Sequence, residues 1–506
     1  MILAGGLIRT LDPQIPTQRA LAIAGEHVAG GVGVHETALA SPETIDLGGR
    51  VVVPGFADSH VHFATWALAQ TEVNLDGCTS LDEAVGRIRA GGLPGDGRWL
   101  RGYGWRSGDW TDGREPTRQD LDTVTGDVPA ALIAKDYHSL WLNTAGLERA
   151  GGDLEVAGGV VERAPDGTPT GVLREEAAWR FKARYMTVPD DEYVTAMRAG
   201  MRLANSRGVT AVHDKDGWLG ALRLWQQLGA GTLTLRVWQS IPHEQVASAT
   251  ELGVRSGFGD PMLALGYLKV FMDGTLGSQT AWLLDGSGVQ ITSGEELAEI
   301  VRLGAAAGLP VAVHAIGDRA NREALDAFEQ TRDVWVPLGL RHRIEHAQLL
   351  APEDIPRFAK LGVAASVQFA HAPSDRSLAD RFWANKTAGA YAYRSLIDSG
   401  AVVANGSDAP IEELDPLAGI RAGVRRTIDD KPPWHPEQAV TIDQAFHATC
   451  VAPAWLARAE RRRGTLIPGR DADLVVLDRD PWDDLDAQVV ATMVAGRWVH
   501  NPPPWN

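Results

Sequence analysis

Short apolar segments alternate with amphipathic segments through the middle of the chain. Eight of these segments are rich in Val, Ile, Leu and Ala and end in turn-forming or polar residues, which is typical of buried strands. They span residues 51–62, 208–214, 234–240, 265–274, 309–318, 340–348, 362–370 and 401–410. Between most of them the apolar residues recur at helical spacing, as in residues 293–308 and 321–333. Eight strands alternating with helices predict an α/β fold, a (β/α)8 TIM barrel.

The two ends of the chain have a different pattern. They carry short apolar segments separated by turn residues, among them residues 471–480 and 489–501. Neither end alone can bury both faces of a sheet, so we expect the two to pair into one composite β-sandwich. The predicted boundaries are residues 1–54 and 456–506 for the sandwich, and residues 55–455 for the barrel.

One long stretch interrupts the alternation between the first and second barrel strands. It covers about residues 64–207 and is rich in Trp, Gly and Asp. A structureless loop of that length is improbable in a compact domain, so we predict an inserted subdomain after barrel strand 1. A doubly wound open sheet is the alternative for the middle region as a whole. No glycine-rich fingerprint follows the first strand to support that alternative.

The composition narrows the range of partners. The formal charge is −17, from 65 acidic and 48 basic residues among 506, which argues against nucleic acid and anionic membranes as partners. Only Cys78 and Cys450 are present, so no disulfide framework is expected. The N-terminus lacks a signal-peptide pattern, and no run approaches the roughly 18 apolar residues of a membrane span. We expect a cytoplasmic protein with a small-molecule substrate, and a homodimer only from base rates.

Residues that can bind metal lie at the ends of five strand segments. The first segment ends in two histidines one residue apart, whose rings share one face of a strand. The complete set is His60, His62, Lys269, His314, His346 and Asp408. In a barrel, catalytic residues come from the C-terminal ends of several strands. A single buried histidine is more often a core residue, and Asp408 alone could cap a helix, so only the joint placement indicates a metal site.

The ligand types predict a pair of ions. Four imidazoles and a carboxylate suit Zn²⁺, Fe²⁺, Mn²⁺ or Co²⁺, with zinc as the expected metal. Two divalent ions about 3.5–4 Å apart require an anionic bridge. Deprotonated Lys269 can react with carbon dioxide to give a carbamate whose two oxygens supply that bridge. The expected cofactors are therefore two divalent metal ions and a carbon dioxide-derived carbamate on Lys269.

Motifs along nearly the whole chain, from about Val52 to Asp478, resemble the amidohydrolase superfamily. "PGFADSHVHF" is similar to its first-strand signature, and "GTLIPGRDADLVVLD" to the segment that returns to its β-sandwich. The closer resemblance is to the amidohydrolase-3 branch, which includes N-substituted formamide deformylase-like proteins. It is carried by "RGYGW", "PTRQDLD", "DYHSLWLN", "GVLREEA", "GVTAVHD", "LKVFMDGTLGSQTA", "VHAIGD", "RIEHAQ" and "GSDAP". The resemblance implies a metal-dependent hydrolase with the same six site residues.

The expected reaction is hydrolysis of an amide, N-formyl or N-acyl C–N bond of a small molecule by a metal-activated hydroxide. Asp408 is the expected catalytic residue, which takes the proton of the water and returns it to the leaving nitrogen. Three alternatives stay open: a mononuclear deaminase of the same superfamily, an ester or lactone hydrolase, and a non-catalytic scaffold. A further alternative has no barrel, and its histidines are scattered core residues.

Five further residues are candidate substrate contacts. They are Trp105 and His138 in the insertion, Asp273 after strand four, and Gln368 and His371 after strand seven. Ser278 is a similar candidate, and His213 is a candidate partner for a ligand. Tyr137 stands where relatives often have a small residue, so the pocket beside His138 is expected to be narrow. The substrates of relatives are therefore not transferred to this chain.

Overall fold

The computed structural model describes residues 1–31, 43–95 and 97–505. Residues 32–42, inside the predicted N-terminal region, lie outside the described residues. The chain divides into two compact units, one made of Met1–Phe63 with Arg198–Asn506, the other of Ala64–Met197. The second unit corresponds to the insertion predicted at about residues 64–207. In the sequence, the boundary between the two units falls within helix α7 (Asp190–Ser206).

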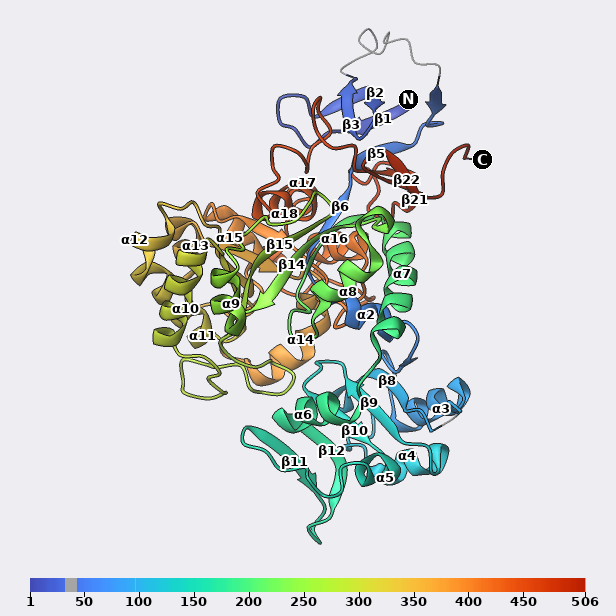
Figure 1. Ribbon diagram of the computed structural model, residues 1–506, viewed down its shortest axis with the longest axis vertical. Helices are drawn as coiled ribbons and strands as arrows, with labels where there is room; N and C mark the ends of the chain where they lie inside the picture. The colour runs from blue at the N-terminus through green and yellow to red at the C-terminus, as the bar shows by residue number, and fades with distance from the viewer. Residues whose placement is uncertain (32–42, 96, 506) are drawn as a thin grey trace. The chain divides into compact units, whose positions relative to one another are not determined.

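Eight parallel strands form the central sheet of the larger unit (Figure 1). In spatial order they are β6 (Phe56–Val61), β13 (Val209–Asp214), β14 (Arg236–Pro242), β15 (Leu263–Phe271), β16 (Val311–Ala315), β17 (Arg343–His346), β18 (Ala364–Val367) and β19 (Val403–Asn405). Each lies in or overlaps one of the predicted segments. Two backbone hydrogen bonds join the end of β6 to the residues that follow β19. Asp408 N donates to His60 O at 2.7 Å, and His62 N donates to Ala409 O at 2.9 Å. The predicted TIM barrel is confirmed.

The first predicted strand, residues 51–62, is two strands in the structure. β5 (Val51–Pro54) belongs to the terminal sheet and β6 to the barrel, with Gly55 between them. A Cβ on Gly55 would come within 2.3 Å of the Thr210 hydroxyl, so only glycine fits this close approach of the two strands. The chain therefore enters the barrel at the predicted boundary between residues 54 and 55.

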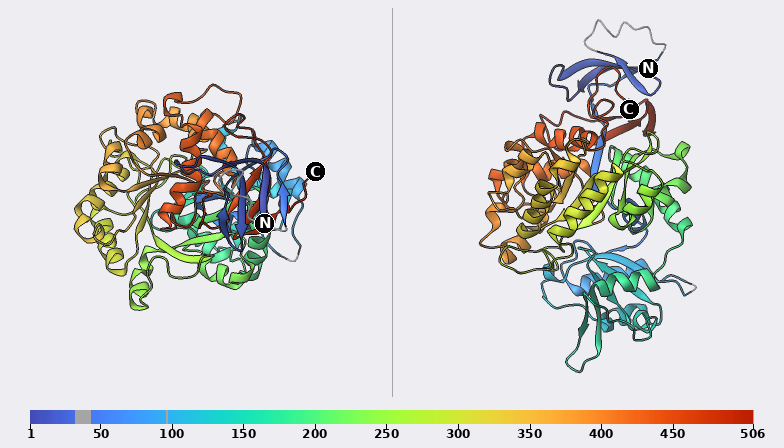
Figure 2. Two further views of the ribbon diagram at one scale, coloured as in Figure 1. Left: turned by 90° about the horizontal axis from the view of Figure 1, so that it is seen from above. Right: turned by 60° about the vertical axis from the view of Figure 1, so that its left-hand side comes forward.

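Helices lie outside the barrel strands (Figure 2) and bury their apolar faces against them. They are α8 (Ala221–Leu228), α9 (Val246–Glu251), α10 (Gly294–Ala307), α11 (Asp318–Gln330), α12 (Arg332–Trp335), α13 (Ile355–Leu361), α14 (His371–Phe382), α15 (Tyr393–Asp398), α16 (Pro416–Arg425), α17 (Ile442–Phe446) and α18 (Ala452–Leu456). Helix α10 shows how the sequence sets the ends. Ser293 and Glu296 form a capping box, and Gly308 ends the helix in the left-handed conformation.

Both ends of the chain contribute to a second eight-stranded sheet. Its order is β22 (Arg497–His500), β21 (Val489–Val494), β20 (Leu474–Leu477), β5, β1 (Ile2–Arg9), β2 (Thr17–Ala24) and β3 (His27–Gly30), with β4 (Thr44–Asp46) paired to β1. Antiparallel pairing of β20 with β5 joins the two ends. Leu3, Val52, Leu474 and Met493 are fully buried in one shared core, as expected if neither end can bury its apolar face alone.

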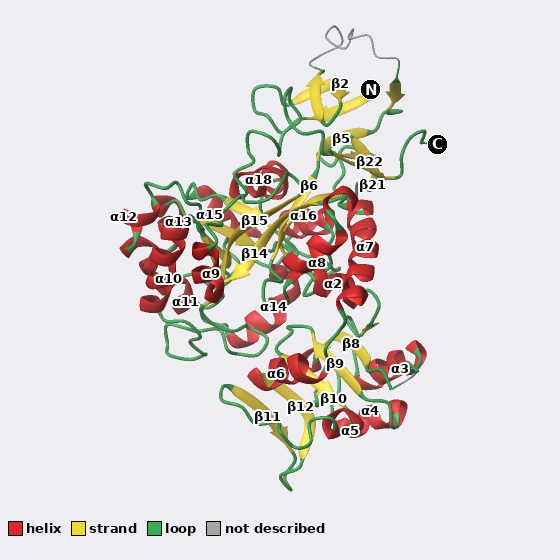
Figure 3. Ribbon diagram, viewed as in Figure 1, coloured by secondary structure: helices red, strands yellow, loops and turns green. Residues whose placement is uncertain are grey.

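The inserted unit has its own six-stranded sheet (Figure 3). Its order is β11 (Gly159–Arg163), β12 (Pro169–Glu175), β10 (Ser139–Leu142), β9 (Ala130–Ala134), β8 (Leu100–Trp105) and β7 (Val73–Asn74). The helices of this part of the chain are α2 (Phe63–Ala69), α3 (Leu81–Gly91), α4 (Arg118–Thr125), α5 (Thr144–Glu148) and α6 (Glu176–Tyr185). Among all described residues, no helix is long and apolar enough to cross a bilayer.

Candidate metal centre

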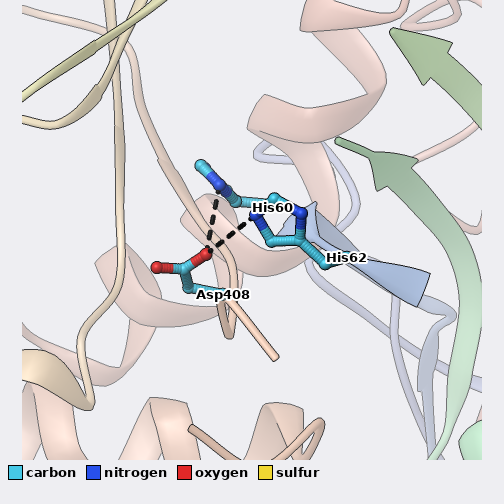
Figure 4. Close-up of side chains that lie close together, drawn as sticks. All are labelled: His60, His62 and Asp408. Carbon is cyan, nitrogen blue, oxygen red and sulfur yellow. Dashed lines mark ion pairs between the residues drawn. The ribbon is translucent and has the colours of Figure 1, made fainter. Parts of the chain in front are cut away.

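The C-terminal ends of the barrel strands bring histidines from β6 and β17 to one carboxylate. The Nε2 atoms of His60 and His62 lie 3.2 and 3.6 Å from Oδ1 of Asp408, and both rings face that carboxylate (Figure 4). On the other side, Nδ1 of His346 lies 3.8 Å from Oδ2 of Asp408. Segments far apart in the sequence meet here because parallel strands end at the same rim of the barrel.

His314 extends this group through ring contacts. The ring of His346 lies between those of His60 and His314, with centroids 4.7 and 4.6 Å away. Four histidines and Asp408, five of the six residues predicted to bind metal, therefore form one continuous cluster. His346 and Asp408 both have positive φ, 71° and 59°. Such backbone is strained for residues other than glycine and is often found at functional sites.

Lys269, the sixth predicted residue, lies on β15 and is buried. Its Nζ has no hydrogen-bond partner among the described residues and lies 4.6 Å from the ring centroid of Phe271. The Phe271 ring is in turn 4.9 Å from the His314 ring. Burial lowers the pKa of Lys269 to about 8, and the Glu345 and Asp408 carboxylates counteract that effect only in part. The amine is therefore more easily deprotonated than an ordinary lysine.

Each histidine of this cluster has a hydrogen-bond acceptor at one ring nitrogen. Nδ1 of His60 lies 2.7 Å from Oε2 of Glu345, and Nδ1 of His62 lies 3.0 Å from Oδ1 of Asp216. The other two contacts are His346 Nδ1 to Gln368 Oε1 at 2.9 Å and His314 Nε2 to Gly274 O at 3.1 Å. An acceptor keeps the proton on the contacting nitrogen, so the second nitrogen of the ring presents a lone pair. Metal-binding histidines have such partners.

A buried charged network holds Glu345 in place beneath His60. Arg343 donates to both oxygens of Glu345, and Nζ of Lys215 lies 3.0 Å from its Oε1. Burial by itself would raise the pKa of Glu345, but Arg343, Lys215 and His60 lower it well below its usual range. Glu345 is therefore a carboxylate that can accept from His60. Burial also lowers the pKa of His60 itself, to about 4, so its ring is neutral at pH 7.

His371 begins helix α14 and joins the cluster from the far side of Asp408. Its Nε2 lies 3.8 Å from Oδ2 of Asp408, and its ring is nearly parallel to that of His346, with centroids 6.1 Å apart. Two groups of side chains could therefore hold an ion, and Asp408 belongs to both. These groups are His60 with His62 and Asp408, and His346 with His371 and Asp408, each with its ligand atoms within 4.8 Å of one another.

The other predicted contacts near the rim brace the backbone or the ligands. Asp273 accepts hydrogen bonds from the backbone N–H groups of Trp282, Ile316 and Gly317 at 2.8–3.0 Å, which fixes the loop after β16. Ser278 contacts the hydroxyls of Thr275 and Thr280. His213 lies 2.8 Å from the Arg343 guanidinium, and therefore reaches His60 only through Arg343 and Glu345.

The two predicted contacts in the insertion lie within that unit's own packing. Trp105 is buried, packs against Trp110 and Trp141, and donates from Nε1 to Leu132 O at 2.8 Å. Nδ1 of His138 lies 2.7 Å from Oε2 of Glu175, and its ring packs against Trp179. The neighbouring Tyr137 has φ 62°. Substrate contact by Trp105 and His138 stays a prediction.

Gln368, the partner of His346, is among the residues predicted from the sequence, but Glu345 and Asp216, the partners of His60 and His62, are not. Glu345 directly precedes His346, and Asp216 follows β13 in the run "HDKD" that includes His213 and Lys215. The signal was a dense charged run at the end of an otherwise apolar strand. A strand that is buried on both faces offers little reason for charged residues unless they are paired.

A parallel barrel with histidines around one carboxylate at its C-terminal rim is typical of metal-dependent hydrolases. The chain matches the Amidohydrolase family over residues 43–500 and belongs to that family. This confirms the resemblance predicted from the sequence. It is 31% identical over 490 residues to the putative amidohydrolase YtcJ of Bacillus subtilis, covering 91% of each protein. It is 30% identical to protein LONG AFTER FAR-RED 3 of Arabidopsis thaliana, covering 99% of this chain and 91% of that protein.

Two further similarities concern an enzyme and a solved structure. The N-substituted formamide deformylase of Arthrobacter pascens is 28% identical, with 97% of this chain and 96% of that protein covered. An uncharacterized metal-dependent hydrolase from Pyrococcus furiosus has a structure similar to this one, with a TM-score of 0.75 and 28% identity. That similarity covers 95% of this chain and 99% of the Pyrococcus chain.

Proposed function

We propose that this protein hydrolyses an amide, N-formyl or N-acyl C–N bond of a small molecule, with two bound divalent metal ions. The observation that carries the proposal is the cluster around Asp408. Nitrogens of His60 and His62 face a carboxylate, and acceptor partners orient the two rings. The N-substituted formamide deformylase among the relatives supports a C–N bond as the target.

The residues present fit a pair of ions. His60, His62 and Asp408 would hold one ion. His346 and Asp408, with the His314 ring beside His346, would hold a second. Lys269 contributes a buried amine with no hydrogen-bond partner among the described residues. A buried amine without a partner is costly to keep, whereas a carbamate on Lys269 would be an anion suited to two cations. Imidazole and carboxylate ligands suit zinc.

Asp408 is suited to move the proton of the reaction. When bound, the metal ions would lower the pKa of a water and polarise the substrate carbonyl. Burial alone would raise the pKa of Asp408, but His60 and His346 lower it well below its usual range. Asp408 is therefore a carboxylate at neutral pH and can accept a proton. Returning that proton to the leaving nitrogen completes cleavage of the C–N bond.

An aromatic surface beside the site favours a substrate with an apolar group. The ring of Trp218 lies 5.3 Å from that of Phe271, which contacts His314. Trp218 follows β13 at the same rim and is half-exposed. An exposed tryptophan next to metal-binding residues is suited to pack against an apolar or aromatic substituent.

The test is elemental analysis of protein purified without added metal, followed by turnover assays with N-formyl and N-acyl compounds. Two zinc equivalents, and hydrolysis that His60→Ala abolishes together with metal binding, are the expected results. One ion per chain with ammonia release from purines or pyrimidines would indicate a deaminase. Ester or lactone turnover without amide turnover would replace the substrate class. Bound metal without turnover across the whole panel would contradict catalysis.

A further inference from the structure

His371 contacts a hydrogen-bond donor, whereas the predicted histidine ligands contact acceptors. The nitrogen contacts of His60, His62, His314 and His346 are to carboxylate, carbonyl or amide oxygens. Nδ1 of His371 instead lies 3.0 Å from the amide nitrogen Nε2 of Gln348. An amide nitrogen only donates, so Nδ1 of His371 accepts, and the proton of its neutral ring lies on Nε2.

The Nε2–H of His371 points into the metal site without a hydrogen-bond partner. Oδ2 of Asp408 lies 3.8 Å from this nitrogen, which is beyond hydrogen-bond distance. No other partner exists for this atom among the described residues, although the side chain is buried. A buried donor normally has a partner, so an orphan donor beside the reacting groups indicates a missing acceptor.

The ring is held in a fixed position. His371 begins α14, and its ring is parallel to that of His346 within 8°. Gln348, whose amide nitrogen contacts Nδ1 of His371, follows β17 directly and is itself buried. The backbone carbonyl of Gln348 accepts from Tyr391 N. A donor that is already oriented needs no reorganisation during the reaction, which is the requirement for stabilising charge in a transition state.

We infer that His371 is a catalytic residue, which donates a hydrogen bond from Nε2 to the oxygen of the scissile carbonyl as that oxygen gains negative charge. This inference rests on the proposed function. It assigns His371 a direct contact with the reacting oxygen in place of the role of metal ligand, which would need the lone pair of Nε2. The substrate class follows: a compound whose carbonyl carbon becomes tetrahedral.

A second buried histidine supplies the matched control. Nδ1 of His342 accepts from the backbone N–H of Val311 at 2.9 Å, so its ring has the same tautomer as His371. Its Nε2 also has no hydrogen-bond partner among the described residues, but the ring packs between Phe328 and Trp335 in the core. Replacing His342 removes the same chemical group from a place where no substrate lies.

The experiment compares four variants, His371→Leu, His371→Gln, His342→Gln and His346→Asn. For each, bound zinc is measured by elemental analysis, zinc affinity by competition with a chelator, and kcat and KM with the best amide substrate. Circular dichroism and thermal melting establish that each variant is folded. His371→Leu is expected to keep its zinc and to lose about 100- to 1,000-fold in kcat with little change in KM, the typical loss for one oxyanion donor.

The other variants separate the possible roles. His371→Gln retains an amide donor and is expected to recover at least tenfold of the kcat lost in His371→Leu. His342→Gln is expected to lower the melting temperature and leave kcat unchanged, whereas His346→Asn is expected to lose zinc. Loss of zinc in both His371 variants would show that His371 is a ligand and overturn the inference. Undiminished kcat in His371→Leu would overturn it as well.

Failure of the proposed function gives a different result from failure of this inference. Absence of amide hydrolysis by the zinc-loaded wild-type protein across the panel would overturn the proposed function, and the inference with it. Hydrolysis by the wild-type protein together with full activity of His371→Leu would overturn only the assignment of His371.

Discussion

Two buried charged clusters lie at opposite ends of the barrel strands, and they are built differently. At the C-terminal rim, Arg343 and Lys215 hold Glu345, which accepts a hydrogen bond from Nδ1 of His60. Toward the N-terminal end, Arg236 at the start of β14 makes a two-fold contact with Asp473 at 2.6 and 3.0 Å. That cluster connects the barrel to the terminal sheet, because Asp473 directly precedes β20.

The difference lies in where each cluster ends. Around Arg236, the carboxylates bind guanidinium and backbone groups, such as Ala495 N, which donates to Asp473 at 2.8 Å. At the rim, the chain of contacts ends at histidine nitrogens that face Asp408. Buried charge therefore does not identify a functional site by itself. What distinguishes the rim is that its network ends at histidine nitrogens around Asp408 and that Lys269 has no hydrogen-bond partner among the described residues, the basis of the proposed site.

The largest expected effect comes from Asp408 at the rim. Asp408→Asn removes the carboxylate shared by both ligand groups and the proposed proton acceptor. We expect kcat to fall about 1,000-fold or more, at the upper part of the range for general acid–base catalysis. Steady-state assays and zinc analysis of the folded variant are the measurement. Asp473→Asn is the control at the other cluster, and it should leave kcat unchanged. Near wild-type activity in Asp408→Asn would show that the rim cluster does not differ in function from the Arg236 cluster.

Arg236 is expected to affect stability and not catalysis. Arg236→Met leaves Asp473 buried without its main cation, and breaking a buried ion pair in this way costs about 3–5 kcal/mol. Urea unfolding of the zinc-loaded protein measures the loss, with Arg236→Lys as a partial replacement. The variant's kcat is expected to stay within about twofold of wild type where it is folded. A larger fall in kcat without destabilisation would show that the two clusters are not separate in function.

Glu345 is expected to have an intermediate effect, on metal affinity. Glu345→Gln keeps an acceptor for His60 Nδ1 but removes the charge that Arg343 and Lys215 balance. Partners of metal-binding histidines contribute about 10- to 100-fold in affinity, so zinc should bind that much more weakly. Chelator competition measures it. The matched control is Asp471→Asn at the other cluster, where Oδ2 of Asp471 lies 3.4 Å from the Arg236 guanidinium. Equal zinc affinity in Glu345→Gln and wild type would contradict the role of the rim network.

Most of the barrel could be predicted from the sequence because each strand carries its own pattern. Eight apolar segments between helices identify the strands, and residues that can bind metal at their ends indicate the rim. Segment 51–62 was interpreted as one strand because Val51–Pro54 and Phe56–Val61 are both apolar. Hydrophobic periodicity does not show that a buried segment changes sheets at Gly55.

The partners of His60 and His62 could not be predicted, because they depend on register between distant strands. His60 and Glu345 are 285 residues apart, and their contact follows from the pairing of every strand between them. The role of His371 depended on the amide of Gln348, which no spacing rule connects to it. The substrate contact of Trp105 is predicted from its place in the insertion and stays a prediction. In the structure this side chain is part of the core of the inserted unit, so its place in the sequence alone does not separate packing from recognition.

The smallest expected effect concerns Lys269 and is a change with pH in the rate of zinc uptake at the rim. Burial lowers its pKa to about 8, and only the neutral amine reacts with carbon dioxide. The neutral fraction rises as pH increases through about 8, so it is about tenfold larger at pH 9 than at pH 7. At a fixed concentration of dissolved carbon dioxide, zinc uptake by the metal-free protein should therefore be faster at pH 9, and at either pH it should increase with added bicarbonate. Lys269→Met should remove the response to bicarbonate, while Arg236→Lys at the other cluster should preserve it. A bicarbonate response that survives in Lys269→Met would show that the carbamate forms elsewhere or not at all.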